Sequence, residues 1–243
     1  MLELIIPNWP APLNVKAVVT TRQGGVSPAP YESLNLGTHV GDEHAGVARN
    51  RVLLKETARL PADPHWLQQV HGCRVAQCDP EGLPVAADAS TTTVPGRVCA
   101  VLTADCLPLL ICNRRGTRVA AVHAGWRGLA SGIIEATLAR FEPDDELLVW
   151  LGPAIGPTAF EVGGEVRDAF LTVDPLAEDG FKSNRPGHWL ADLYFLARRR
   201  LALPSVTYLG GGDHCTLSDS NRFFSYRRDG ITGRMASLIW LSE

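Results

Sequence analysis

The middle of the sequence holds three short apolar runs separated by tight turns, and no other feature of the chain limits its fold as strongly. The runs span residues 97–103, 107–112 and 118–123. Runs of this length that end at turn formers, such as those of NRRGT, are typical of buried strands. We therefore predict that the three are strands and that they lie next to one another in one sheet.

A helical pattern follows the last of these runs, because AGWRG leads into LASGIIEATLARF, whose small residues suit close packing on a sheet. Other expected strands span 2–6, 15–21, 147–151, 205–211 and 235–241, and other expected helices span 45–60, 164–171 and 189–201. The stretch RQGGVSPAPYESLNLGTHVGD is rich in turn formers and is expected to be a functional loop. The sequence shows neither a fixed repeat nor a linker. We interpret residues 1–243 as a single α/β (α+β) domain in which mixed β-sheets are layered with helices.

Composition excludes several classes of function. Hydrophobic residues make up 45% of the chain and charged residues 20%, as in ordinary globular proteins. A net charge of -3 gives no broad basic field, so nucleic acid and anionic membranes are not expected partners. The N-terminus does not resemble a signal peptide, and no apolar window reaches the roughly 18 residues of a membrane span. We expect a cytoplasmic monomer whose partners are small molecules.

Cysteine and histidine are the side chains to consider first, because thiolate sulfur and neutral imidazole nitrogen are preferred zinc donors. The candidates are His71 in LQQVHGCRV, Cys106 in LTADCLPLL and His123 in VAAVHAGWRG. Their separations of 35 and 17 residues are unlike those of structural zinc modules. A lone histidine at a strand edge and a lone buried cysteine are more often structural. The argument for a site is that Cys106 and His123 bracket a hairpin-like connection, which would bring them side by side.

If the three donors meet, they leave the fourth tetrahedral position of a zinc ion open, which is typical of catalytic sites. Such an ion would supply hydroxide at neutral pH or polarise a substrate atom. Without a metal, Cys106 and His123 would instead be a nucleophile and its base, oriented by Asp105 or another polar group. The sequence chemistry leaves both interpretations open.

Arginines in polar clusters suggest an anionic or sugar-bearing ligand, because the guanidinium donates paired hydrogen bonds to phosphate. The candidates for substrate binding are Arg22 in TTRQGG, Arg49 in RNR and Arg227 in SYRRDG. Each by itself is more often a solvated surface residue. Arg227 is favoured, since the neighbouring aromatic residues of FFSYRRDG would stack on a base.

The segments TADC (103–106) and HAGWRG (123–128) strongly resemble those of the laccase-domain family, also called the multicopper polyphenol oxidase or purine nucleoside phosphorylase family. Further segments look like family segments in the same order: TRQGGVS, SLNLGTHVGD, QQVHG, the pair Asp88 and Ala89, LGPAIGP, FEVGGEV, FFSYRRDG and TGRMAS. The resemblance implies that His71, Cys106 and His123 are zinc ligands. It also implies an α/β fold related to the toxin-type cysteine hydrolases.

For activity, the resemblance implies phosphorolysis of adenosine, inosine, guanosine and methylthioadenosine, and hydrolytic deamination of adenosine. In the deamination, Asp105 is our candidate for the proton shuttle. Members of the family are also described as copper-dependent polyphenol oxidases and as editors of peptidoglycan precursors, and these remain the alternatives. We rank copper below zinc, because the chain has seven histidines and no His-x-His pair such as a copper cluster would use.

Overall fold

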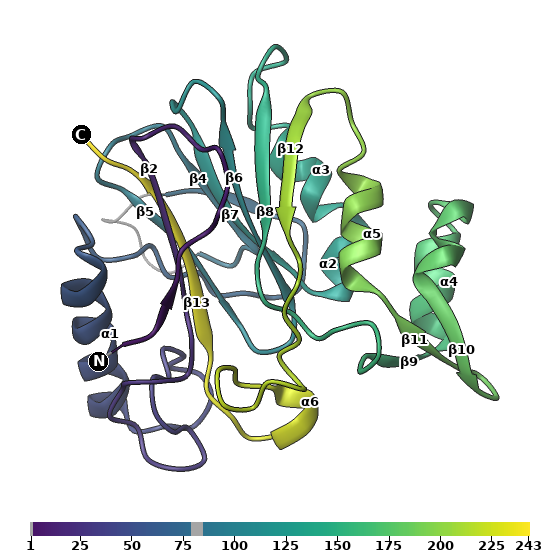
Figure 1. Ribbon diagram of the computed structural model, residues 1–243, viewed down its shortest axis with the longest axis horizontal. Helices are drawn as coiled ribbons and strands as arrows, with labels where there is room; N and C mark the ends of the chain where they lie inside the picture. The colour runs from purple at the N-terminus through teal and green to yellow at the C-terminus, as the bar shows by residue number, and fades with distance from the viewer. Residues whose placement is uncertain (1, 79–84) are drawn as a thin grey trace.

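Two β-sheets face each other at the centre of the computed structural model, which describes residues 2–78 and 85–243 (Figure 1). The four-stranded sheet has the order β1 (Leu4–Ile5), β2 (Val15–Thr20), β13 (Met235–Leu241), β5 (Val98–Thr103). The six-stranded sheet has the order β12 (Val206–Gly211), β8 (Leu147–Leu151), β6 (Leu107–Asn113), β7 (Val119–Ala124), β4 (Ala89–Thr92), β3 (Val75–Gln77). The predicted mixed α/β class is therefore confirmed.

Strand pairing agrees with the sequence prediction for two of the three central strands. β6 and β7 are antiparallel neighbours, with Pro108 opposite His123. β5 does not join them, because it pairs with β13 in the four-stranded sheet. The prediction of three neighbours in one sheet was wrong for a physical reason: all three strands are buried along their whole length, so their patterns do not distinguish the two sheets. The short turn after β5 carries the chain from one sheet to the other.

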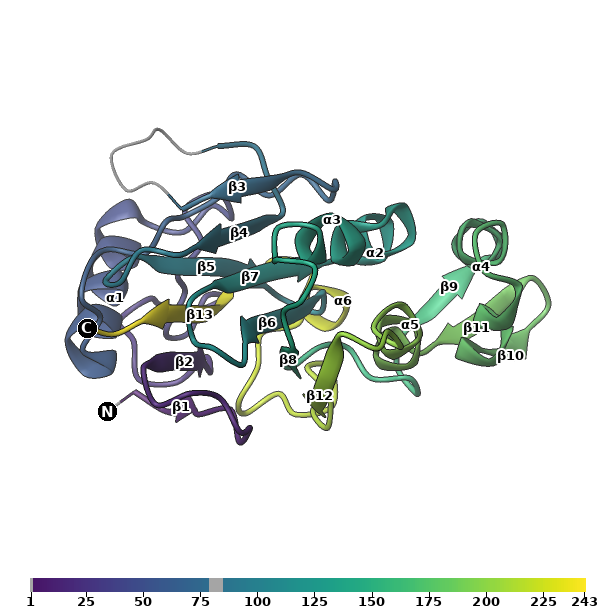
Figure 2. The same ribbon diagram turned by 90° about the horizontal axis from the view of Figure 1, so that it is seen from above.

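The apolar side chains form layers around these sheets. One core lies between them and includes Val101, Leu110 and Ile239. A second core covers the outer face of the six-stranded sheet with α2 (Trp126–Ser131), α3 (Ile133–Leu138) and α5 (Leu193–Arg200). A third packs α1 (His44–Ala58) and the loop before it on the outer face of the four-stranded sheet. Helices thus lie outside both sheets, as Figure 2 shows.

Two predicted helices differ from the observed ones. The pattern over 129–141 is divided into α2 and α3 at Gly132, whose φ of 98° lies in the left-handed region that glycine adopts without strain. The first residues of the pattern over 189–201 belong to β11, and α5 begins only at Leu193, where the Asp192 side chain accepts a hydrogen bond from the N–H of Phe195. An N-terminal cap of this kind outweighs apolar periodicity.

A small unit extends from one side of the six-stranded sheet, as both ribbon views show. It contains β9 (Glu161–Gly163), α4 (Gly164–Leu171), the 3₁₀-helix η1 (Pro175–Gly180), β10 (Phe181–Arg185) and β11 (His188–Ala191). α4 has the predicted bounds, whereas the three short strands were not predicted. The remaining helix, α6 (Tyr226–Asp229), precedes β13. In the described part of the chain, no helix is both long and apolar enough to cross a membrane.

Candidate metal centre

Three donor side chains meet at the end of the sandwich where the chain passes from one sheet to the other. His71 lies in the loop before β3, Cys106 in the turn between β5 and β6, and His123 near the end of β7. The pairing of Pro108 with His123 places the turn that holds Cys106 beside the imidazole. The predicted juxtaposition of Cys106 and His123 is confirmed, and His71 completes the group.

The spacing of the three donors suits a single metal ion. Their ligand atoms lie within 4.8 Å of one another, and Cys106 Sγ is 3.8 Å from His71 Nε2. Zinc bonds of about 2.3 Å to sulfur and 2.1 Å to nitrogen place tetrahedral donors roughly 3.5 Å apart. Among the described residues no fourth cysteine, histidine or carboxylate belongs to this group. A metal held here would therefore keep one position open.

Asp88 orients both histidines. Its fully buried carboxylate accepts a hydrogen bond from His123 Nδ1 at 2.8 Å, which leaves Nε2 as the nitrogen with a free lone pair. The same carboxylate accepts from the backbone N–H of His71 at 2.8 Å and of Gly72 at 2.7 Å. His71 has a φ of 60°, which is uncommon outside glycine, and these bonds hold the backbone in that conformation. Burial would raise the pKa of Asp88, but the bonds from His123 and the backbone lower it.

Replacing Asp88 by asparagine should weaken metal binding by about 10- to 100-fold, the usual effect of losing an outer partner of a ligating histidine. The amide cannot accept from both the imidazole and the two backbone groups, because one of its ends is a donor. Zinc affinity can be measured by competition with a chelating dye. Asp145→Asn is the control, since Asp145 is also buried but bonds to Asn113 and Arg115. Equal zinc affinity in the Asp88 variant and the wild type would contradict this role.

Without metal, Cys106 and His123 form a charged pair. Burial of the Cys106 sulfur would raise the pKa of its thiol, but the charge and hydrogen bonding of His123, and then of His71, lower this pKa to about 6. Burial would lower the pKa of His123, but the Cys106 thiolate and the bond to Asp88 raise it to about 9. The metal-free protein thus holds a thiolate and an imidazolium at neutral pH.

The affinity for zinc should rise with pH by about tenfold per unit between about pH 6 and about pH 9, because the ion must displace the proton of His123. Above the raised pKa of His123 no proton remains to be displaced, and the affinity should level off. Below the lowered pKa of Cys106 the thiol is protonated as well, so the dependence should become steeper. Competition titrations across this range, corrected for the competitor's own protonation, measure the slope. A flat profile would contradict the charged pair.

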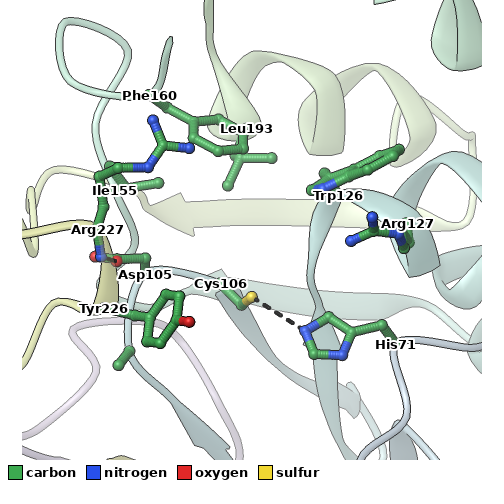
Figure 3. A pocket seen from close by; sticks show the side chains of 11 residues that line it. His71, Asp105, Cys106, Trp126, Arg127, Ile155, Phe160, Leu193, Tyr226 and Arg227 are labelled. Carbon is green, nitrogen blue, oxygen red and sulfur yellow. Dashed lines mark hydrogen bonds between the residues drawn. The ribbon is translucent and has the colours of Figure 1, made fainter. Parts of the chain in front are cut away.

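A cavity of about 240 Å³ opens beside two of the donors, His71 and Cys106 (Figure 3). Its apolar wall consists of Trp126, Ile155, Phe160 and Leu193. Figure 3 shows Trp126 and Phe160 on the side away from Cys106, whose sulfur points to His71. We call this space the aromatic cavity.

Asp105 and Arg227, both singled out from the sequence, line the aromatic cavity. The Asp105 carboxylate accepts hydrogen bonds from Thr216 Oγ1 at 2.6 Å and from the N–H of Arg227 at 2.7 Å. The Arg227 guanidinium lies 5.3 Å from the ring centre of Phe160 and donates to the carbonyl of Glu161. The aromatic neighbourhood inferred for Arg227 is present: Tyr226, the residue before it, lines the same cavity, and Phe160, which was not predicted, lies under its guanidinium.

The structure does not bring Arg22 and Arg49 to the three donors. Arg22 donates to the carbonyls of Glu32 and Ser220, and Arg49 lies on an exposed face of α1. Neither residue lines a cavity at the donors. Their role as substrate contacts stays a prediction.

A second cavity of about 390 Å³ shares His71, Cys106 and Tyr226 with the aromatic cavity and extends away from it to His39 and Arg234. The sequence reasoning named neither His39 nor Arg234 as a site residue, and it included Tyr226 only among the aromatic residues next to Arg227. Arg234 lies in TGRMAS, which was noted only as a family segment, and His39 lies in the turn-rich stretch that was expected to be a functional loop. The one available signal was the unusual length of the turn-rich loop that holds His39.

Fold and site together define a mixed α/β protein with an open His-Cys-His site beside a cavity large enough for a small molecule. The chain belongs to the family described as multi-copper polyphenol oxidoreductase laccase, which matches residues 16–242. The expected relation to toxin-type cysteine hydrolases is a separate matter and stays a prediction.

Relatives similar over nearly the whole chain include a protein of Pseudomonas aeruginosa named purine nucleoside phosphorylase, which is 57% identical over 98% of both chains. Another is the purine nucleoside phosphorylase YfiH of Escherichia coli K12, 55% identical over 99% of this chain and 100% of the relative. A solved structure of a Neisseria meningitidis protein matches with a TM-score of 0.95 at 50% identity, covering 99% of each chain. YlmD from Geobacillus stearothermophilus matches with a TM-score of 0.88 at 31% identity, covering 99% of this chain and 96% of that chain.

Proposed function

We propose that the protein is a zinc-dependent purine nucleoside phosphorylase acting on adenosine, inosine, guanosine and methylthioadenosine. One observation carries the proposal: an open set of three metal donors lies where two cavities meet, one apolar and aromatic and the other lined by the guanidinium of Arg234. The names of the relatives support the same activity. We further propose a cytoplasmic monomer that binds its nucleoside and phosphate directly.

In this proposal the purine occupies the aromatic cavity. Trp126 and Phe160 present aromatic surface to a planar base, and Ile155 and Leu193 exclude water from its edges. Arg227 is the proposed contact to the nucleoside, because it is exposed at the mouth of this cavity and held over Phe160. The ribose would then lie next to Cys106 and His71, two of the residues common to both cavities.

His71, Cys106 and His123 would hold the zinc ion. When bound there, zinc supplies a Lewis acid that polarises a substrate oxygen or nitrogen. The chain itself contributes positioning, since Asp88 holds the imidazole of His123 and the backbone of His71, and the aromatic wall orients the base. Deamination of adenosine is the proposed second activity, with Asp105 moving the proton, because its carboxylate borders the cavity.

A Cys-His hydrolase is the alternative that a specific observation favours. In this alternative Cys106 would be the nucleophile, His123 its base, and Asp88 the carboxylate that orients the base. The Cys106 thiolate contacts the His123 imidazole, which in turn contacts the Asp88 carboxylate, as in other catalytic triads. The orienting group is Asp88 rather than Asp105, whose carboxylate bonds to Thr216 and Arg227. The copper oxidase alternative gains less support, because the described residues contain no second group of three metal donors.

The test is to incubate the protein with inosine and phosphate, with and without a chelator, and to follow hypoxanthine and ribose 1-phosphate. We expect chelation to stop product formation and added zinc to restore it. Full activity after demonstrated metal removal would favour the Cys-His enzyme. No product under any metal condition would reject the phosphorylase and favour the oxidase or the editing of peptidoglycan precursors.

A further inference from the structure

The second cavity and a third one next to it form a continuous cationic cleft. The third cavity, of about 500 Å³, shares His39, Gln69 and Leu102 with the second. His39, Arg51 and Arg234 line this cleft, whereas no aspartate or glutamate lines either cavity. Among the described residues that line the cleft, the anionic group is the Cys106 thiolate, which belongs to the metal donors, so the guanidinium groups of Arg234 and Arg51 favour an anion in the rest of the cleft.

Among these groups, Arg234 gives the strongest evidence for an anion site. Burial lowers the pKa of its guanidinium, so the charge is partly removed from water. Nη1 donates to the carbonyls of Thr232 and Gly233, both at 3.0 Å. Within the described residues Arg234 has no carboxylate within ion-pair distance, and its Nε and Nη2 donate no hydrogen bond. The charges of Cys106 and Asp105 act on this half-buried guanidinium only from beyond ion-pair distance, so a partner in direct contact with it is expected to come from outside the chain.

Arg51 adds a second positive charge to the cleft, and His39 adds an imidazole that can form hydrogen bonds. Arg51 lies 4.2 Å from the ring centre of Trp66 and donates through Nε and Nη2 to the carbonyl of Leu36, so its charge is held in place but not neutralised. Burial lowers the pKa of Arg51 to about 10. Partial desolvation, followed by the charges of Arg234 and Arg51, lowers the pKa of His39. The charges of both guanidinium groups therefore act on His39 and favour its neutral form.

We propose that Arg234 and His39 form the subsite for the phosphate co-substrate, and that the charge of Arg51 strengthens the attraction of the anion. This inference rests on the proposed function, because it assigns the second substrate of the same site. The cleft meets the aromatic cavity along Cys106, His71 and Tyr226 and extends away from the wall that would hold the purine. Phosphate bound in the cleft would thus face the ribose from the side opposite the base.

That arrangement is the one that phosphorolysis needs. A phosphate oxygen forms a bond to the anomeric carbon while the bond from that carbon to the purine nitrogen breaks. The electron pair of the broken bond leaves with the purine, and the proton of hydrogen phosphate goes to that base. The products are ribose 1-phosphate and the free purine, with no other reactant required. Arg234, with two unused donor groups, is suited to hold the phosphate oxygens that do not react.

The subsite can be tested by calorimetric titration of the zinc-loaded protein with inorganic phosphate, at an ionic strength kept constant with chloride. Arg234→Met should weaken phosphate binding by about tenfold or more, since a charge-assisted contact is lost. Arg234→Lys should retain part of the phosphate affinity, because lysine keeps the positive charge but lacks the paired N–H donors of the guanidinium. Arg140→Met, which removes an exposed arginine away from the cavities, should have no effect. Zinc content and unfolding temperature show whether each variant is intact.

Arg227→Met tests the aromatic cavity independently of the cationic cleft. It should weaken inosine binding and leave phosphate binding unchanged, whereas Arg234→Met should do the reverse. Phosphate affinity that falls in the Arg227 variant and not in the Arg234 variant would overturn the subsite, as would equal affinity in the Arg234 variant and the wild type. Because phosphate binding is measured without turnover, the subsite can hold even if no phosphorolysis is found. Conversely, phosphorolysis with an unchanged KM for phosphate in the Arg234 variant would reject the subsite alone.

Discussion

Cys106→Ala should lose zinc and phosphorolysis together. The alanine removes one of three ligands and the only negative charge among them, and the two remaining imidazoles bind zinc far more weakly. The loss of affinity should exceed the roughly 10- to 100-fold that removal of an outer partner causes. Metal analysis of the purified variant, together with the inosine assay, measures both effects.

The control for this prediction is Cys215→Ala, which removes a partly buried cysteine outside the donor group. It should keep the zinc and the activity of the wild type. If Cys106→Ala instead abolishes turnover while zinc stays bound, Cys106 is a covalent nucleophile and the metal assignment of the thiolate is wrong. Measuring zinc content and turnover together in Cys106→Ala therefore distinguishes the phosphorylase from the Cys-His hydrolase.

Much of the site could be predicted from local patterns because two of its residues lie on adjacent strands. The apolar runs over 107–112 and 118–123 and the turn between them predict a hairpin, and a hairpin determines that Cys106 and His123 meet. His71 could not be placed in this way. It approaches from a loop far along the chain, and only the family resemblance connected it to the other two.

The residues that support the metal donors escaped prediction for a different reason. Asp88 precedes β4, whose sequence ASTT lacks the apolar alternation of a strand, so nothing in it indicated a neighbour of β7. His39 and Arg234 reach the site from a loop and from the start of β13, and their roles depend on which charges face them across a cleft. Contacts between segments so distant in sequence depend on tertiary packing, which no local pattern encodes.

Gly125 provides a second way to disturb the metal without removing a ligand. It precedes α2 with a φ of -61°, which alanine adopts without strain. A Cβ atom at this position would lie 2.8 Å from His71 Cδ2 and 3.1 Å from Cys106 Sγ. The first distance is below any ordinary contact, so the imidazole must move. Its backbone cannot follow freely, because Asp88 holds the N–H of His71.

Gly125→Ala should therefore lower zinc affinity and phosphorolysis by a large factor while the fold survives, since overpacking costs about 1–3 kcal/mol. Zinc per chain, phosphorolysis and unfolding temperature are measured on the same preparation. Gly46→Ala in α1 is the matched control: its Cβ would lie 3.6 Å from Ser27 Oγ, an ordinary contact, and zinc binding should not change. Zinc affinity equal to that of the wild type in Gly125→Ala would mean that the imidazole of His71 has room to shift. A metal site that tolerates this shift cannot depend on the fixed position of His71, and the role assigned to Asp88 in holding it would have to be abandoned.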